Sequence, residues 1–143
     1  MRYLSTFESL NNIVYRIANN QDYVSIKKIA NQHREYLPFV MRVAIEDSIK
    51  RDEVLVAECN NRVVGFLHFH KRRDGYTTVH EIGIDREYQS MGIGKKLLSY
   101  LEKPIQLKVT KDNQVNEFYK RLGFKFIKEV EGTKRVLNLY VLR

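Results

Sequence analysis

The sequence has little cysteine, little proline and no long apolar stretch. Cys59 is the one cysteine among 143 residues, which excludes an internal disulfide and a cysteine-based zinc framework. No apolar run approaches the roughly 20 residues of a membrane-spanning helix, and the first residues lack the apolar core of a signal peptide. We therefore expect a cytoplasmic protein with no membrane partner, in which Cys59 is a small buried hydrophobic residue.

Length and charge narrow the class of protein further. A chain of 143 residues has the size of one domain, and we expect residues 1–143 to form a single domain. Residues 1–59 carry eight basic and eight acidic side chains, whereas residues 60–143 carry seventeen and nine, so the second segment accounts for the whole net charge of +8. A basic C-terminal half suits a polyanionic ligand, either a phosphate-bearing cofactor or a nucleic acid.

The hydrophobic periodicity predicts alternating strands and amphipathic helices. One helix is expected after Asp22, its predicted N-cap, and should end before Pro38; a second should turn Val40, Val43, Ala44 and Ile49 inward. The other helices are predicted at residues 93–101 and 112–122. Strands are predicted at residues 13–18, 53–59, 63–70, 76–84, 105–110, 124–130 and 135–142. The order β-α-α-β-β-β-α-β-α-β-β predicts an α/β fold, a mixed sheet with helices on its faces.

A glycine-containing turn lies between a predicted strand and a predicted helix. It reads Gln-Ser-Met-Gly-Ile-Gly-Lys over Gln89–Lys95, and its glycines allow the backbone to approach a ligand closely. Unpaired amides at the start of the following helix favour a phosphate or pyrophosphate. A Rossmann site requires a third glycine, and a P-loop requires Ser or Thr after Gly-Lys, so neither motif fits.

Two segments together resemble the GNAT N-acetyltransferase family. The stretch His80–Gly94, with its Q-x-x-G-x-G turn, resembles that family's acetyl-CoA-binding motif. The stretch Phe118–Phe124, Phe-Tyr-Lys-Arg-Leu-Gly-Phe, resembles the second cofactor motif. The order of elements agrees over nearly the whole chain, from about Ile13 to Leu142. The resemblance implies the GNAT acyl-CoA N-acyltransferase fold and acetyl-CoA as co-substrate, without a metal.

The resemblance also implies which residues hold the cofactor. The strand before the turn should pair with the pantetheine arm and splay away from the next strand, and Gly83 is compatible with a bulge there. The backbone of the turn should hold the pyrophosphate, and Asn113 or Asn116 should contact the pantetheine, although Asn113 also suits a helix cap. The predicted cofactor-binding residues are Ile82, Gly83, Ile84, Gln89, Ser90, Met91, Gly92, Ile93, Gly94, Lys95, Asn113, Asn116 and Tyr119.

The implied reaction is direct attack of a primary amine on the acetyl thioester in a ternary complex. No Ser/His or Cys/His constellation is apparent that would support an acyl-enzyme. Tyr119 is the expected acid for the departing thiolate. Glu81 and His80 are alternative bases, Glu81 by residue type and His80 by its ordinary pKa near 6.5. Strand alternation predicts that these two side chains point to opposite faces, with His80 beside Ile82 and Glu81 beside Gly83.

The acceptor is not specified by these motifs. In this family it is usually selected by the connection between the first two helices, where Arg34, Glu35 and Tyr36 are candidates. Leu107 stands where members that acetylate peptide N-termini often carry a glutamate, which disfavours a ribosomal-protein type of substrate. We expect a small-molecule or protein amine, and a monomer or homodimer. Two alternatives stay open: an inactive acyl-CoA-binding regulator, or an RNA-directed acetyltransferase of the aminoacyl-tRNA type, although most basic residues are scattered.

Overall fold

The strands and helices follow the predicted order. A computed structural model describes residues 12–35, 37 and 42–143. The strands are β1 (Ile13–Ile17), β2 (Val54–Cys59), β3 (Arg62–Lys71), β4 (Thr77–Ile84), β5 (Ile105–Thr110), β6 (Lys125–Glu131) and β7 (Val136–Leu142). The helices are α2 (Tyr23–Gln32), α3 (Arg42–Lys50), α4 (Ile93–Ser99) and α5 (Val115–Arg121), with 3-10 turns at Asn20–Asp22 and Arg86–Tyr88. No helix in these ranges is long and apolar enough to span a membrane.

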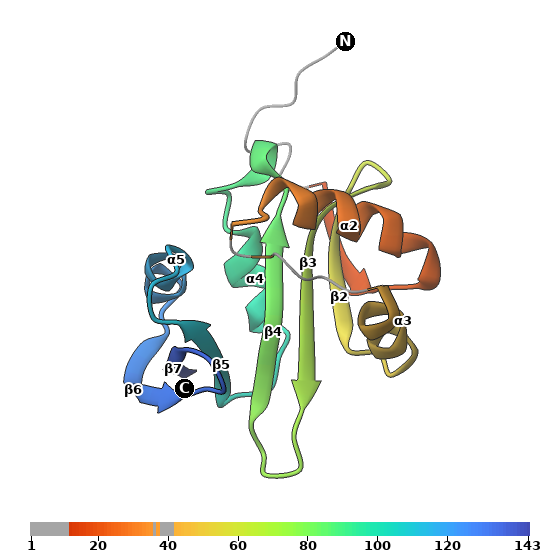
Figure 1. The fold of residues 1–143 in the computed structure, drawn as a ribbon. Helices are drawn as coiled ribbons and strands as arrows, with labels where there is room; N and C mark the ends of the chain where they lie inside the picture. Colours follow the sequence, from red (N-terminus) through yellow and green to blue (C-terminus); the bar gives the residue numbers. More distant parts are fainter. Residues whose placement is uncertain (1–11, 36, 38–41) are drawn as a thin grey trace.

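All seven strands belong to one mixed sheet that opens in its middle. The strand order is β1-β2-β3-β4-β5-β7-β6, and β4–β5 is the one parallel pair among the described strands. That pairing consists of Thr77 with Ile105 and Thr78 with Gln106, after which the two strands separate (Figure 1). The splay implied by the family resemblance is therefore present, between β4 and β5.

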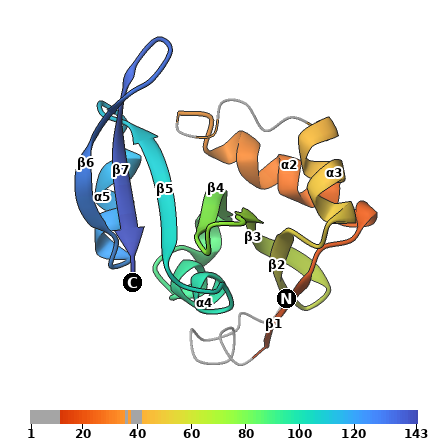
Figure 2. The same ribbon diagram turned by 90° about the horizontal axis from the view of Figure 1, so that it is seen from below.

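Two apolar clusters cover the two faces of the sheet. Helices α2 and α3 lie on one face of β2–β4, and α4 lies on the opposite face (Figure 2). The first cluster contains Ile26, Ile45 and Phe66, and the second contains Leu97 and Leu107. The second cluster also takes in residues of α5 and β7, so it connects the two halves of the opened sheet. Cys59 is buried within it, as its sequence context predicts.

The first two helices differ in detail from the sequence prediction. Helix α2 ends at Gln32, although His33 and Leu37 remain buried beyond it. Asp22 occupies the N-cap position of this helix, as predicted, but its side chain makes no capping hydrogen bond, because its buried carboxylate accepts hydrogen bonds from Arg16 and from the amide of Asn19.

Burial alone would raise the pKa of Asp22, but the hydrogen bonds from the Arg16 guanidinium and the Asn19 amide outweigh it and lower that pKa.

In α3 the predicted inward face is wrong in part. Val43 and Ala44 are exposed, whereas Ile45, Ser48 and Ile49 form the i, i+3, i+4 stripe that faces the sheet. Val40 lies outside the described residues.

A bulge in β4 overturns the predicted strand alternation. The register passes from His68 opposite Glu81 to Phe69 opposite Val79, so His80 is an extra residue in β4. The side chains of His80 and Glu81 therefore lie on the same face, toward α2 and α3, and both contact His68. Their predicted placement on opposite faces was wrong because strict alternation holds only where the register is regular.

Gly83 has a packing role. It pairs with Phe66 in regular register, so the bulge expected near Gly83 lies three residues earlier. A Cβ at Gly83 would lie 2.6 Å from Phe66 Cε1 and 3.2 Å from Ile29 Cγ2. Because Gly83 has no side chain, Phe66 of β3 and Ile29 of α2 can pack against this point of β4.

We predict that Gly83→Ala destabilises the protein by about 1–3 kcal/mol, because the new methyl group overpacks the core. Urea unfolding without ligand measures this change. Gly94→Ala is the matched control, since its Cβ would meet no atom closer than 3.6 Å. Its place in a helix should make that substitution neutral or stabilising by up to about 1 kcal/mol. Equal stability of the two variants would contradict this role of Gly83.

Candidate active site

The glycine turn at the end of β4 has a backbone shape that few residues adopt. Ser90 has φ 64° and Gly92 has φ 81°, and α4 begins directly afterwards at Ile93. Before the turn, the Asp85 carboxylate accepts a hydrogen bond from the amide of Glu87 and pairs with Arg62 at 2.8 Å. The start of the turn is therefore anchored, while the amides after Gly92 stay available at the surface of the sheet opening.

A cavity of about 440 Å³ lies between this turn, β4 and α5. Its wall contains the cations Lys95 and Arg121 and no carboxylate. Gln89 and Ser90 add polar groups at the turn, and mostly apolar side chains line the rest, which suits a ligand with a phosphate end and a long, weakly polar arm. The lining residues are Ile82, Gly83, Ile84, Tyr88, Gln89, Ser90, Gly92, Ile93, Gly94, Lys95, Phe118, Arg121 and Leu122.

All but four of the predicted cofactor-binding residues line this cavity. Met91 packs against the apolar cluster beneath the turn. Asn113 Oδ1 accepts a hydrogen bond from the amide of Val115, the first residue of α5, at 2.9 Å, while Gln114 holds the N-cap position without a side-chain cap. Asn116 and Tyr119 are both buried and do not line this cavity.

Asn116 is saturated with protein contacts. Its Nδ2 donates to the carbonyl groups of Thr110, Lys111 and Asn113, and its Oδ1 accepts from Asn138 Nδ2 at 3.0 Å and from the Tyr140 hydroxyl at 2.8 Å. These bonds tie α5 to the end of β5 and to β7. Asn116 therefore holds the β5–β7 half of the sheet together, and no part of its amide is left for a ligand.

Tyr119 lies in the core close to the cavity. Its ring packs edge-on against Phe118, a cavity-lining residue, and against Phe124. The side chain is 6% exposed and belongs to the cluster beneath β4 and β5.

The two base candidates belong to a compact group of titratable side chains. Nδ1 of His68 lies 2.7 Å from Oε2 of Glu81, and the His80 ring packs on the His68 ring at 4.8 Å between centroids. Partial desolvation, the largest effect, lowers the pKa of His80. His80 is therefore neutral at pH 7 and keeps a lone pair.

The same group contains a serine. Nε2 of His68 lies 2.7 Å from Oγ of Ser48 on α3, so a Ser-His-Glu constellation does exist. The sequence prediction that none was apparent was wrong, because the three residues come from α3, β3 and β4 and share no sequence motif. Among the described residues, no group of three or more His, Cys, Asp or Glu side chains is placed to hold a metal ion.

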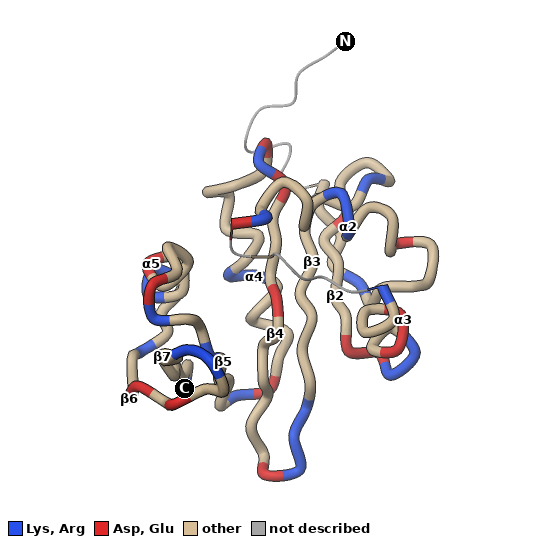
Figure 3. Tube along the Cα trace, in the orientation of Figure 1, with Lys and Arg blue, Asp and Glu red and all other residues tan. Residues whose placement is uncertain are grey.

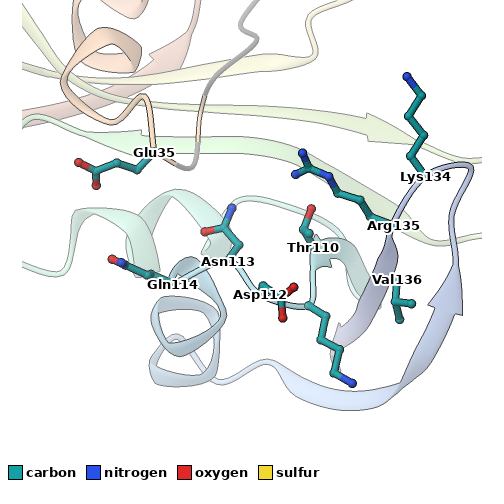
Figure 4. Close-up of a pocket in the computed structure, with 9 residues that line it drawn as sticks. Glu35, Thr110, Asp112, Asn113, Gln114, Lys134, Arg135 and Val136 are labelled. Atoms are coloured by element: carbon teal, nitrogen blue, oxygen red, sulfur yellow. The ribbon is translucent and has the colours of Figure 1, made fainter.

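A second cavity, of about 700 Å³, lies across the sheet opening from the first. It is bordered by Glu35 after α2, by Thr110–Gln114 between β5 and α5, and by Lys134–Val136 at the β6–β7 turn. Figure 4 shows Arg135 reaching toward the Thr110–Asn113 segment, whereas Lys134 extends away from it. Of the residues proposed to select an acceptor, Glu35 lines this cavity, Arg34 is exposed outside it, and Tyr36 lies outside the described residues.

Basic residues do not gather on one face. Figure 3 shows lysines and arginines spread over both halves of the molecule and interleaved with acidic residues. The tight basic group of the sequence, Lys71–Arg73, lies at the β3–β4 turn, at the opposite end of β4 from the glycine turn. Lys71 and Arg72 are paired there with Glu102 and Asp74, each at 2.8 Å. This distribution disfavours the nucleic-acid alternative.

Comparison with known proteins decides the family. Residues 50–126 match the family model described as an acetyltransferase (GNAT) domain, which is more than half of the chain. The chain belongs to the GNAT acetyltransferase family. The resemblance seen in the glycine turn and in Phe118–Phe124 is thereby confirmed.

Individual GNAT proteins agree with this assignment. A relative named 5-NmdU N-acetyltransferase, from Pseudomonas phage PaMx11, is 29% identical over 121 residues, which cover 78% of this chain and 86% of the relative. The solved structure of Ard1 from Thermoplasma volcanium has a TM-score of 0.76 at 19% identity, over 92% of this chain and 97% of that chain. The PaiA N-acetyltransferase of Thermoplasma acidophilum, solved in complex with coenzyme A, has a TM-score of 0.71 at 17% identity, over 91% of this chain and 99% of that chain. These likenesses confirm the mixed α/β fold of the GNAT family.

Some cavity residues were not foreseen from the GNAT motifs. Arg121, the last residue of α5, and Leu122, its C-cap, follow Phe118 by three and four positions, so all three lie on the side of the helix toward the glycine turn. The i+3 and i+4 spacing from Phe118 would have predicted both residues as part of the cavity wall. Tyr88 is the last residue of the short 3-10 turn before Gln89, and it lines the cavity wall.

We predict that Asn116→Ala lowers the free energy of unfolding by about 2–4 kcal/mol, because it leaves several buried polar groups without partners. Coenzyme A affinity of the folded variant should change little. Urea unfolding and calorimetric titration measure the two quantities. Asn113→Ala is the matched control, with an expected cost of about 1 kcal/mol for one lost hydrogen bond at the start of α5. A large loss of affinity at unchanged stability would instead show that Asn116 is a cofactor ligand.

Proposed function

We propose that this chain transfers an acetyl group from acetyl-CoA to a primary amine by direct attack in a ternary complex. The observation that carries the proposal is the opening between β4 and β5, with a carboxylate-free cavity on the glycine-turn side and a second cavity on the other. Two ligands can thus approach the same opening from opposite sides. Membership of the GNAT family and the coenzyme A complex of a structural neighbour support the donor.

The first cavity fits acetyl-CoA. The amides after Gly92, together with Lys95 and Arg121, suit a pyrophosphate, because they combine backbone donors with positive charge. Beyond Thr78, β5 does not pair with the edge of β4, so backbone groups at Val79–Ile84 are available to the amides of the pantetheine arm. Bound acetyl-CoA supplies the activated acetyl thioester, and the remaining steps fall to residues of this chain.

Glu81 is the proposed general base. Its side chain is 20% exposed, so one carboxylate oxygen stays reachable while Oε2 is held by His68. It takes the proton of the acceptor ammonium directly or through a water, the amine forms the new C–N bond, and the C–S bond breaks. His80, neutral at pH 7 and next to the same pair, is the second candidate for this proton.

Tyr119 is the proposed acid. It occupies the tyrosine position of the second GNAT motif and lies beside the cavity-lining Phe118. In the proposed reaction its hydroxyl gives a proton to the sulfur as the C–S bond breaks. The second proton that the nitrogen loses on becoming an amide returns the tyrosinate to its hydroxyl form, directly or through water, and the proton taken by Glu81 is released to solvent.

The second cavity is the proposed entrance for the acceptor. Glu35 suits the ammonium of an incoming amine, and Arg135 suits an anionic group elsewhere on it. The phage relative is named for 5-NmdU, so 5-NmdU joins peptides, polyamines and amino sugars as an acceptor to test.

An amine panel tests the proposed function. We expect acetyl-CoA-dependent release of the free thiol with at least one amine of the panel, measured with a thiol reagent. Gly92→Val is the control and should abolish release, because a β-branched residue is strained at φ 81°. Tight binding of acetyl-CoA without release for any amine would instead identify an inactive binding module.

We predict that Tyr119→Phe lowers kcat about 100-fold or more, because the leaving sulfur then lacks its acid. Coenzyme A affinity should stay within about twofold, since the ring and its packing are kept. Single-turnover kinetics and calorimetry measure both. Wild-type turnover in this variant would exclude Tyr119 as the acid.

A further inference from the structure

We propose that His68 is a positioning residue that holds the Glu81 carboxylate for its role as base, within a hydrogen-bond chain running from Arg51 through Ser48. The proposal rests on the proposed function, in which Glu81 accepts the proton of the amine. It adds residues from β3 and α3 that no GNAT motif in this sequence contains.

The geometry of His68 allows little freedom. The residue is 7% exposed, with Nδ1 at 2.7 Å from Glu81 Oε2 and Nε2 at 2.7 Å from Ser48 Oγ. The ring is also covered by His80. Both nitrogens are thus engaged, and rotation of the ring would break two short hydrogen bonds at once.

The hydrogen-bond chain runs in one direction, from Arg51 as donor to Glu81 as acceptor. Arg51 Nη2 donates to Ser48 Oγ at 3.2 Å, and Arg51 Nε donates to Glu53 at 2.9 Å, which fixes the guanidinium. Ser48 therefore accepts from Arg51 and has its own O–H left for Nε2 of His68. Nε2 accepts, so Nδ1 carries the hydrogen and donates to the ionised Glu81, which can only accept. The neutral Nδ1–H tautomer of His68 satisfies every group.

This order reverses that of a Ser-His-Asp hydrolase triad. There the serine is the exposed, reacting end, and the acid orients the histidine. Here Ser48 is 3% exposed on the sheet-facing side of α3, while Glu81 is the end that solvent reaches. The constellation therefore serves the carboxylate and cannot form an acyl-serine. Besides Glu81, the charged or titratable groups near His68 are His80 on β4, Arg51 after α3, and the Glu53–His70 pair bonded to Arg51.

The tautomer gives a test that does not depend on activity. We expect ¹⁵N-detected NMR of the full chain near pH 7 to show His68 protonated at Nδ1 and unprotonated at Nε2. Protonation at Nε2 alone would overturn the chain of donors. This outcome stands whether or not any amine is acetylated, so it separates the proposal from the proposed function.

Two amide substitutions provide the kinetic test. In His68→Asn the side-chain nitrogen can take the place of Nδ1 and donate to Glu81; in His68→Gln it can take the place of Nε2 and reach only Ser48. We expect His68→Gln to lower kcat about 10–100-fold, with KM for both substrates within about twofold, and His68→Asn to recover a large part of the loss. Glu58→Gln is the control: Glu58 of β2 pairs with Arg16 of β1 at 2.6 Å, this pair shares no residue with the chain, and kcat should not change.

The kinetic outcomes separate the positioning role of His68 from the role of Glu81 as base. Wild-type kcat in His68→Gln, with Glu81→Gln strongly impaired, would overturn the positioning role and leave Glu81 as base. Wild-type kcat in Glu81→Gln would overturn the role of Glu81 and the positioning role with it. If the His68 variants do not fold, Ser48→Ala decides: we expect kcat to fall about 3–10-fold at unchanged KM, and an unchanged kcat overturns the chain.

Discussion

The separation of β4 from β5 is the constraint on which the rest of the structure depends. Two residue pairs at Thr77 and Thr78 join the strands, and beyond them the parallel ladder stops. Backbone groups that a continuous sheet would satisfy internally are left at the edges of an opening. Such an edge is costly unless a ligand or water pairs with it, which makes it a natural place for the amide-bearing arm of a cofactor.

An opened sheet needs other ties between its halves. The cluster that includes Leu97 and Leu107 packs beneath both halves, so apolar burial replaces the missing ladder bonds. On the far side, β5 pairs with β7 along its whole length, and Asn116 fastens α5 to both strands. The halves are therefore rigid on either side of the opening, as a site that positions two substrates requires.

Sequence reasoning recovered the order of the elements and the position of the glycine turn because both rest on local patterns. Strand limits at 105–110 and the αL stop at Gly123 follow from hydrophobic alternation and from glycine's freedom at positive φ. It missed the end of α2 at Gln32, since His33 and Leu37 continue the buried stripe after the helix stops. It also misplaced Val43 and Ala44, where two overlapping apolar stripes are available and packing against the sheet selects the other.

The bulge at His80 shows why the chemistry of the site was harder to predict than its location. One extra residue in β4 turns Glu81 and His80 to the same face, where His68 of β3 and Ser48 of α3 meet them. A strand pattern contains no signal for that insertion, because each residue type is compatible with regular alternation. The donor site is built from consecutive residues and can be predicted from a motif. The proposed base is built from three elements and depends on a register that only the folded sheet defines, so this part of the mechanism has to be inferred from the structure.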